Sequence, residues 1–288
     1  MDTNLKLSDQ LVPNEDKFNN DFFKRFKLRH RDSPLQLTDS VSKDYLFPTF
    51  YGDASCAIGI FHCDYEAAKA MMPDPSMKPV KMTKGRALVI FSCYEYRNVM
   101  NVGPYNEVAM TIPVMTDGGM NIPVLSMLLG DKNKKFGYYV FNMPVTSLEN
   151  RIRGRKIWGL PKDTERVAIK QDGQFSTTTA ASDGKEPYFE LKVPMTGSPQ
   201  KFDVKSNLFS VLDQSRLTST TQFEGQFNIT KKMSTLFKKS SKTNVSTLKI
   251  GKGPKADQLR ALKIETDAFQ FRYCESMNAC FDLAHKKV

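Results

Sequence analysis

Long apolar runs are missing from this chain of 288 residues. No stretch approaches the roughly 18 to 20 apolar residues that a membrane-crossing helix needs. Residues 1–10 are polar, where a secretory signal peptide would carry an apolar stretch. These absences predict a protein that stays in the cytoplasm and has no transmembrane segment.

Histidine and cysteine are scarce. The three histidines, His30, His62 and His285, are too few and too scattered for a histidine-based metal site or a Ser–His or Cys–His pair, which excludes much hydrolase chemistry. The five cysteines are odd in number and include no Cys-x-x-Cys pair, so we expect reduced, mostly buried thiols. The glycine patterns of dinucleotide and phosphate binding are also missing. We therefore expect neither a metal nor an organic cofactor.

Acidic residues are outnumbered by basic ones, 31 to 42, which gives a formal net charge of +11. Such a charge attracts nucleic acid, acidic membrane surfaces, or substrates that carry a carboxylate or phosphate. A nucleic-acid site would interleave basic residues with exposed aromatics or carry a known helix motif, and the central region has neither. We expect no nucleic-acid partner.

Residues 1–48 are interpreted as an N-terminal extension with one short amphipathic helix. The run Asn-Asn-Asp at residues 19–21 can cap the apolar positions of residues 22–28. Such an arm could dock on its own domain or a neighbouring subunit, which the shortness of the helix favours. Alternatively, with the help of Arg29, His30 and Arg31, it could touch a membrane or a partner as a peripheral anchor.

Residues 49–288 are expected to form a single domain. Short runs of apolar, β-branched and aromatic residues, separated by turn signals, predict a mainly β (α+β) fold, with an antiparallel, barrel-like sheet and a few flanking helices. The predicted strands are residues 56–61, 86–96, 108–114, 136–141, 166–170 and 188–193.

Helices are expected at residues 65–72, with Asp64 as the N-cap, and at residues 144–152. A basic Ser/Lys-rich segment near 238–256 is expected to be an exposed loop. A C-terminal helix is expected near 265–284, with Phe269, Tyr273 and Cys280 toward the body of the domain.

One segment concentrates the residues suited to chemistry. Residues 151–162 carry two glycines, one proline and the only tryptophan among three arginines and two lysines, which predicts a specially shaped turn. Lys162 follows Pro161, whose φ is fixed, and Trp158 and Leu160 are near enough in sequence to exclude water. Desolvation lowers the pKa of a lysine, and a neutral amine attacks ketones. Lys162 is therefore the predicted nucleophile.

A second segment, Gly-Pro-Tyr-Asn-Glu at residues 103–107, precedes the apolar strand 108–114. It places the carboxylate of Glu107 at the end of a turn, where it could shuttle protons in a carbonyl reaction. Taken alone, a glutamate at a strand start is more often a surface or salt-bridged residue.

The sequence resembles the acetoacetate decarboxylase family. The resemblance is carried by Gly-Arg-Lys-Ile-Trp-Gly-Leu-Pro-Lys at residues 154–162, by residues 103–107 with Ile-Pro-Val at 112–114, and by a segment that ends in Met-Met-Pro-Asp-Pro at 71–75. It implies a closed apolar pocket with a Schiff-base lysine at Lys162, an activated amine known in that family. It further implies a pocket carboxylate at Glu107, pocket walls at Leu160 and Met143, and a homo-oligomer.

The sequence departs from the family pattern at three places. Asp163 stands where the decarboxylases have a second lysine; beside the amine it would oppose activation, but neighbours on a strand face opposite ways. Ser92 or a neighbour stands where they have a second pocket glutamate, and Ala54 or a neighbour where they have an arginine on the first barrel strand. The arginines that could instead hold a substrate carboxylate are Arg97, Arg153 and Arg155.

Three functions are compatible with these residues. The first is a carbon–carbon lyase acting on a small β-keto acid, in which an iminium at Lys162 drives loss of CO2, aldol cleavage or dehydration. The second is a small-molecule binding protein that keeps the fold and pocket without turnover. The third is a peripheral protein acting through its basic arm. For the first, the predicted catalytic residues are Lys162 and Glu107, and the predicted substrate-binding residues are Arg155, Trp158, Leu160, Met143 and Ser92.

Overall fold

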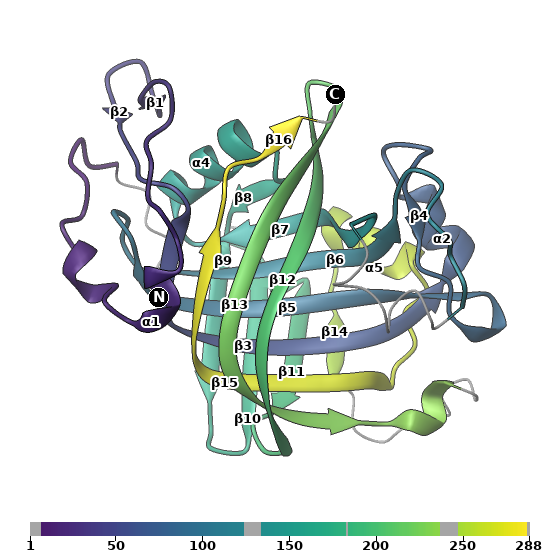
Figure 1. The fold of residues 1–288 in the computed structure, drawn as a ribbon. Helices are drawn as coiled ribbons and strands as arrows, with labels where there is room; N and C mark the ends of the chain where they lie inside the picture. Colours follow the sequence, from purple (N-terminus) through teal and green to yellow (C-terminus); the bar gives the residue numbers. More distant parts are fainter. Residues whose placement is uncertain (1–6, 124–133, 183, 237–246, 287–288) are drawn as a thin grey trace.

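The computed structural model describes residues 7–123, 134–182, 184–236 and 247–286. The protein is mostly β, with 53% strand against 15% helix, and its centre is a closed barrel of seven strands (Figure 1). The mainly β fold predicted from the sequence is confirmed.

Around the barrel the strands run in the order β6, β5, β3, β15, β13, β12 and β7, and pairing of β6 with β7 closes the ring. Every neighbouring pair is antiparallel except β12 and β7. The barrel strands are β3 (Thr49–Asp64), β5 (Arg86–Val99), β6 (Tyr105–Met115), β7 (Phe136–Val145), β12 (Ser198–Leu212), β13 (Ser215–Lys231) and β15 (Ala268–Phe281). Short strands extend this sheet: β4 (Lys78–Pro79) on β6, β8 (Lys162–Thr164) on β7, and β16 (His285–Lys286) on β13.

A second antiparallel sheet packs against the outside of the barrel. Its strands, in spatial order, are β14 (Leu248–Ile250), β11 (Phe189–Pro194), β10 (Phe175–Ala181) and β9 (Arg166–Gln171). Phe91 of β5 packs on Phe189 of β11, with ring centroids 5.1 Å apart. Because side chains alternate along a strand, the other face of β5 points into the barrel. Both faces of this strand are therefore buried, and the polar residues of the interior face are enclosed.

The helices are short and lie outside the barrel (Figure 1). They are α1 (Asp21–Lys24), α2 (Tyr65–Ala70), α4 (Leu148–Trp158) and α5 (Pro254–Ala261), with 3-10 turns η1 (Glu15–Lys17), η2 (Thr83–Gly85) and η4 (Met233–Leu236). Helix α2 confirms its prediction, since the Asp64 side chain accepts a hydrogen bond from the amide of Ala67. The helix predicted at 144–152 begins later, at Leu148, because β7 continues to Val145, and it runs on to Trp158.

The C-terminal helix predicted near 265–284 is wrong. The segment forms β15, a barrel strand between β13 and β3. Tyr273 faces the second sheet, and Cys274 and Met277 belong to the cluster inside the barrel. Buried residues of β15 lie on both of its faces, so the strand lacks a strict period of two, and its apolar residues could be fitted to a helical spacing.

The basic loop predicted near 238–256 is corrected in part. Residues 237–246 lie outside the described residues, and the chain from residue 248 onward forms strand β14 and then helix α5. Ala256 and Leu259 of this helix are fully buried in the cluster between the barrel and the second sheet. These apolar positions make the end of the segment part of the core.

The N-terminal arm lies along one side of the barrel, in purple in Figure 1. Asn20 caps α1 by accepting a hydrogen bond from the amide of Phe22. Phe22 and Phe23 are buried and pack with Phe50 of β3, and Arg25 forms ion pairs with acidic side chains of β12 and β13. The arm is therefore docked on its own domain.

The five cysteines are free thiols and all are buried, as predicted. Across the residues that the structure describes, no helix has the length and apolar character to cross a membrane.

Candidate active site

Two glycines of helix α4 allow Lys162 to reach its position. The helix ends at Gly159, which adopts a left-handed φ of 59°, and a Cβ there would stand 2.8 Å from the carbonyl oxygen of Val211. Glycine is the residue that adopts this conformation without a steric cost. The chain then turns through Leu160 and Pro161 into β8, where Lys162 pairs with Met143 of β7.

The other glycine, Gly154, lies under the Lys162 side chain. A Cβ at Gly154 would stand 2.4 Å from Cδ and 2.8 Å from Cε of Lys162. The lysine stem therefore lies directly on the backbone of α4. Residues 151–158, predicted as part of a special turn, are helical, and only residues 159–161 form the turn.

Lys162 and Glu107 meet in the interior. The Nζ atom of Lys162 donates a hydrogen bond of 2.6 Å to Oε2 of Glu107, and the two side chains are 5% and 6% exposed. Glu107 comes from β6, two residues after Tyr105, whose ring centroid lies 5.6 Å from the same nitrogen. The amine thus has one carboxylate within proton-transfer distance and an aromatic face beside it.

Tyrosines form much of the wall near this pair. Tyr94 and Tyr96 of β5 stand directly opposite Glu107 and Tyr105 in the register of β5 and β6. The rings of Tyr94 and Tyr96 stack on each other, with centroids 5.1 Å apart and an interplanar angle of 11°. Burial is the largest cause that raises the pKa of Tyr94, Tyr96 and Tyr105 well above the ordinary value, and the negative charge of Glu107 adds to it. These phenols stay protonated and are able to donate hydrogen bonds.

Two of the three positions where the family pattern departs, Ser92 and Ala54, lie on the same interior face. Ser92 is 8% exposed and pairs with Ala109, two residues along β6 from Glu107. Ala54 of β3 pairs with Tyr96 and is fully buried. Small side chains therefore occupy both places.

The other predicted substrate-binding residues separate into two groups. Met143 and Leu160 are buried in an apolar cluster that joins the barrel interior to helix α4 and the arm. Trp158 is also buried, but its ring stacks on Phe281 at 4.8 Å and its indole nitrogen donates to the carbonyl of Asp282. These contacts give Trp158 a packing role at the end of the barrel.

Arg155 does not point toward the amine. Its Nε donates a 2.6 Å hydrogen bond to the carbonyl oxygen of Lys162, and its guanidinium pairs with Asp163, with half of the side chain exposed. Lys255 of α5 also pairs with Asp163 at 2.8 Å and with Glu165 at 2.9 Å. Burial alone would raise the pKa of Asp163, but these cations, Lys255 before Arg155, hold it below the ordinary value. Asp163 therefore faces its own cations on the opposite side of β8 from the Lys162 amine.

The remaining two arginines considered from the sequence are also engaged elsewhere. Arg97 forms ion pairs with Asp53, Glu95 and Glu275. Arg153 is buried at 1% exposure, with its guanidinium 4.2 Å from the Tyr45 ring centroid. It stabilises the junction of α4 with the arm.

Sequence reasoning missed the interior tyrosines and the Lys255–Glu165 ion pair. The alternation Ser-Cys-Tyr-Glu-Tyr at residues 92–96 was a usable signal, because on a strand it places Ser92, Tyr94 and Tyr96 on one face. The ion pair joins residues 90 positions apart, and no local pattern predicts it.

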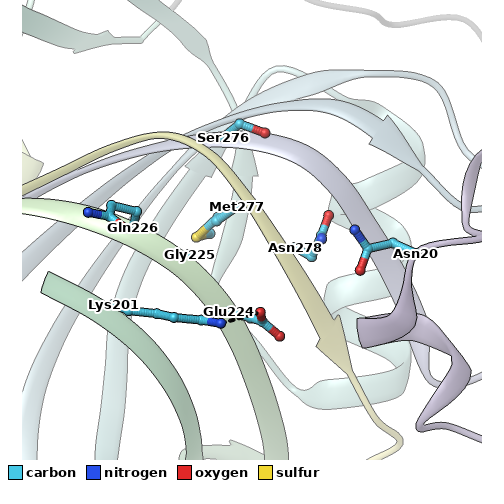
Figure 2. Close-up of a pocket in the computed structure, with 8 residues that line it drawn as sticks. All are labelled: Asn20, Lys201, Glu224, Gly225, Gln226, Ser276, Met277 and Asn278. Atoms are coloured by element: carbon cyan, nitrogen blue, oxygen red, sulfur yellow. Dashed lines mark ion pairs between the residues drawn. The ribbon is translucent and has the colours of Figure 1, made fainter.

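A surface hollow of about 300 Å³ lies away from this pair, on the outside of the barrel (Figure 2). It sits where the register of β13 and β15 shifts near Gly225. Figure 2 shows Lys201 extending toward Glu224, with which it forms an ion pair of 3.2 Å. The residues that line the hollow are Asn20, Lys201, Glu224, Gly225, Gln226, Ser276, Met277 and Asn278.

The barrel with its second sheet has the fold of decarboxylases and related enzymes. The chain belongs to the acetoacetate decarboxylase family, because the family model described as acetoacetate decarboxylase (ADC) matches residues 32–275. No curated protein matches the chain by sequence.

Three solved structures show the same fold at low sequence identity. The acetoacetate decarboxylase from Legionella pneumophila subsp. pneumophila str. Philadelphia 1 has a TM-score of 0.59 and 13% identity, over 84% of this chain and 87% of that chain. The enduracididine biosynthesis enzyme MppR with bound HEPES has a TM-score of 0.56 and 12% identity, over 83% and 87%. An acetoacetate decarboxylase-like enzyme from Sphingomonas wittichii RW1 has a TM-score of 0.51 and 12% identity, over 88% and 94%.

Proposed function

We propose that the protein is a lyase that forms a Schiff base between Lys162 and the ketone carbon of a small β-keto acid. The observation that carries this proposal is the 2.6 Å contact of the Lys162 amine with Glu107 inside the barrel. A buried amine next to a carboxylate that can accept its proton is the arrangement that imine chemistry needs.

The proposed reaction begins when Glu107 takes a proton from Lys162. The free amine adds to the ketone carbon, and the adduct loses water to give a positively charged iminium. In decarboxylation, the bond to the carboxylate then breaks, its electron pair moves toward the iminium nitrogen, and CO2 leaves. A proton returns to the resulting enamine carbon, and water releases the ketone and restores the amine. Aldol cleavage or dehydration would use the same iminium.

Borohydride trapping tests the first step. The protein is mixed with acetoacetate or pyruvate, treated with borohydride, and analysed by intact mass and peptide mapping. We expect one reduced adduct at Lys162 in the wild type and none in Lys162→Met. Lys156→Met serves as the matched control, because Lys156 is an exposed lysine of the same segment and should leave trapping unchanged. Absence of an adduct in the folded wild type would refute the proposal.

The binding-protein alternative is favoured by one observation, the small side chains of Ser92 and Ala54 at the positions where the family has charged residues. The mass of the trapped adduct distinguishes the two functions. If CO2 is lost before reduction, the adduct has the mass expected for the reduced imine of the ketone product. If the carboxylate persists through long incubation with acetoacetate, the protein binds its keto acid without decarboxylating it.

A further inference from the structure

One more arginine lies on the interior face of the barrel. Arg272 of β15 pairs with Ile58 of β3, which in turn pairs with Ser92 of β5. Residues directly opposite each other on paired strands share a face, so Arg272 lies on the same interior face as Ser92. Two residues further along β15, Cys274 begins a row of paired residues that runs through Cys56 and Tyr94 to Glu107, so Glu107 also lies on this face.

Strand order places Arg272 across the barrel from the Lys162–Glu107 pair. Three strand-to-strand steps lead from β15 to β6 in one direction, through β3 and β5, and three lead to β7 in the other, through β13 and β12. Glu107 is on β6, and Lys162 is on β8 beside β7. In a barrel this narrow, side chains from opposite walls can contact the same small ligand.

The Arg272 side chain is held on the interior face by its neighbours. Its Nε donates a 2.8 Å hydrogen bond to Oε1 of Gln270, which is buried, and its guanidinium lies 5.1 Å from the Phe202 ring centroid. Burial raises the pKa of the Cys56 thiol, and the charge of Arg272 opposes that rise, as expected for a cation that faces the interior. The residue is half-buried, so part of it remains open to solvent.

We propose that Arg272 binds the carboxylate of the keto acid whose ketone carbon reacts with Lys162. The inference builds on the proposed Schiff-base function and narrows its substrates to those with an anionic group on the far side from the amine. Arg97, Arg153 and Arg155 make the ion pairs and ring contacts described above. Arg272 brings a planar guanidinium to the interior face, a geometry that suits a carboxylate.

The test compares two ligands that differ in charge. Acetoacetate carries the carboxylate, and 4-methylpentan-2-one has a neutral isopropyl group in its place. Adduct formation by borohydride trapping is measured against concentration for the wild type, Arg272→Gln, Arg272→Lys and Arg97→Gln. The last is a matched control that removes a guanidinium bound to carboxylates away from the interior.

We expect Arg272→Gln to raise the half-saturating concentration of acetoacetate roughly 10- to 100-fold, as for loss of a charged hydrogen bond. For the same variant, the half-saturating concentration of 4-methylpentan-2-one should stay within about 2-fold of wild type, given the small effect expected for a neutral ligand. Arg272→Lys should restore part of the acetoacetate binding, and Arg97→Gln should alter neither. Equal losses for both ligands, or no loss for acetoacetate, would overturn the role of Arg272.

The experiment can also distinguish failure of the Schiff-base proposal from failure of the carboxylate-binding proposal. If the wild type traps neither ligand, acetoacetate binding is measured by calorimetry instead. Binding that weakens in Arg272→Gln but not in Arg97→Gln then supports the carboxylate site on its own. Binding that is absent, or unchanged in Arg272→Gln, rejects it.

Discussion

At the scale of single residues, the buried Lys162–Glu107 ion pair has an unfavourable desolvation free energy. Removing two charges from water costs several kcal/mol per ion, and their mutual attraction often only offsets that cost. A barrel interior filled with apolar side chains would be at least as stable. The pair is therefore better explained by a role in a reaction than by a contribution to stability.

The energetic coupling of this pair is testable in the folded protein. Lys162→Met or Glu107→Gln alone leaves an unsatisfied buried group and should lower the free energy of unfolding by roughly 3 to 5 kcal/mol. The double variant should lose clearly less than the sum of the two, because neither charge remains. Urea unfolding of the four proteins measures the cycle. Strict additivity would show that the two groups do not interact.

Glu107 should matter more for reaction rate than its contribution to folding explains. Glu107→Gln keeps the size of the side chain but cannot accept the amine proton, so trapping at Lys162 should slow by roughly 10²- to 10⁴-fold, the usual contribution of a general base. A trapping rate in Glu107→Gln equal to that of the wild type would contradict this role.

His62 should make stability depend on pH at the other end of the barrel. It is fully buried with neither ring nitrogen hydrogen-bonded within the described chain, and burial, with the charge of Arg86 second, lowers its pKa from 6.5 to about 4. Between these values the unfolded chain binds a proton that the folded protein does not, so stability falls as pH decreases from 6.5 to 4. The shift corresponds to roughly 3 kcal/mol.

His62→Leu removes this group, so its unfolding free energy should fall less steeply than that of the wild type over the same pH window. Subtracting the two curves cancels the contribution of the acidic residues. His285→Leu is the control, because His285 is exposed and its replacement should leave the curve unchanged. Parallel curves for wild type and His62→Leu would rule out a buried neutral imidazole.

At the scale of elements, helix α4 and strand β8 work as one unit that places the amine. Gly154→Ala should normally favour a helix by about 1 kcal/mol. Here its Cβ would overlap the Lys162 side chain. We expect the lysine to be displaced and trapping to be largely lost, while circular dichroism still reports a folded barrel. Gly103→Ala is the control, because nothing lies within 4 Å of a Cβ there. Normal trapping in Gly154→Ala would mean that the lysine does not need this close contact.

Local signals predicted some elements and missed others for physical reasons. Helix α2 was predictable because its Asp64 cap is encoded next to it, and β6 because its apolar run comes after a turn. The hairpin of β12 and β13 was missed because its turn residues, Asp213 and Gln214, both adopt positive φ without a glycine to mark the site. Strand β15 was taken for a helix because burial on both faces erased its alternation.

The site shows the same division. The segment around Lys162 is enough to predict it as the nucleophile. Its partner Glu107 could be a surface residue on local evidence, and only the family resemblance selects it for the site. Arg272 was not considered, since its place on the interior face depends on pairings with strands that are distant in sequence. Positions set by strand register across a barrel are not encoded locally.

At the scale of the whole molecule, the N-terminal arm and the site share one support. Lys43 of the arm forms a 3.0 Å ion pair with Glu149 of α4, and Phe47 contacts the ring of Trp158 in the same helix. Since α4 carries the lysine stem on Gly154, docking of the arm fixes the helix on which the amine rests. The aromatic face that could have entered a membrane is used for this docking.

The arm should therefore contribute to stability and not to membrane binding. Phe23 is 3% exposed, with its ring centroid 4.8 Å from that of Phe50. Phe23→Ala should lower the free energy of unfolding by roughly 3 to 5 kcal/mol, as for a core phenylalanine, and should speed proteolysis within the arm. Val12→Ala, a change at an exposed position of the arm, should do neither. Wild-type protein should not sediment with acidic liposomes at moderate salt. Liposome binding by the wild type, together with unchanged stability in Phe23→Ala, would instead make the arm a peripheral anchor whose phenylalanines are free to leave the barrel.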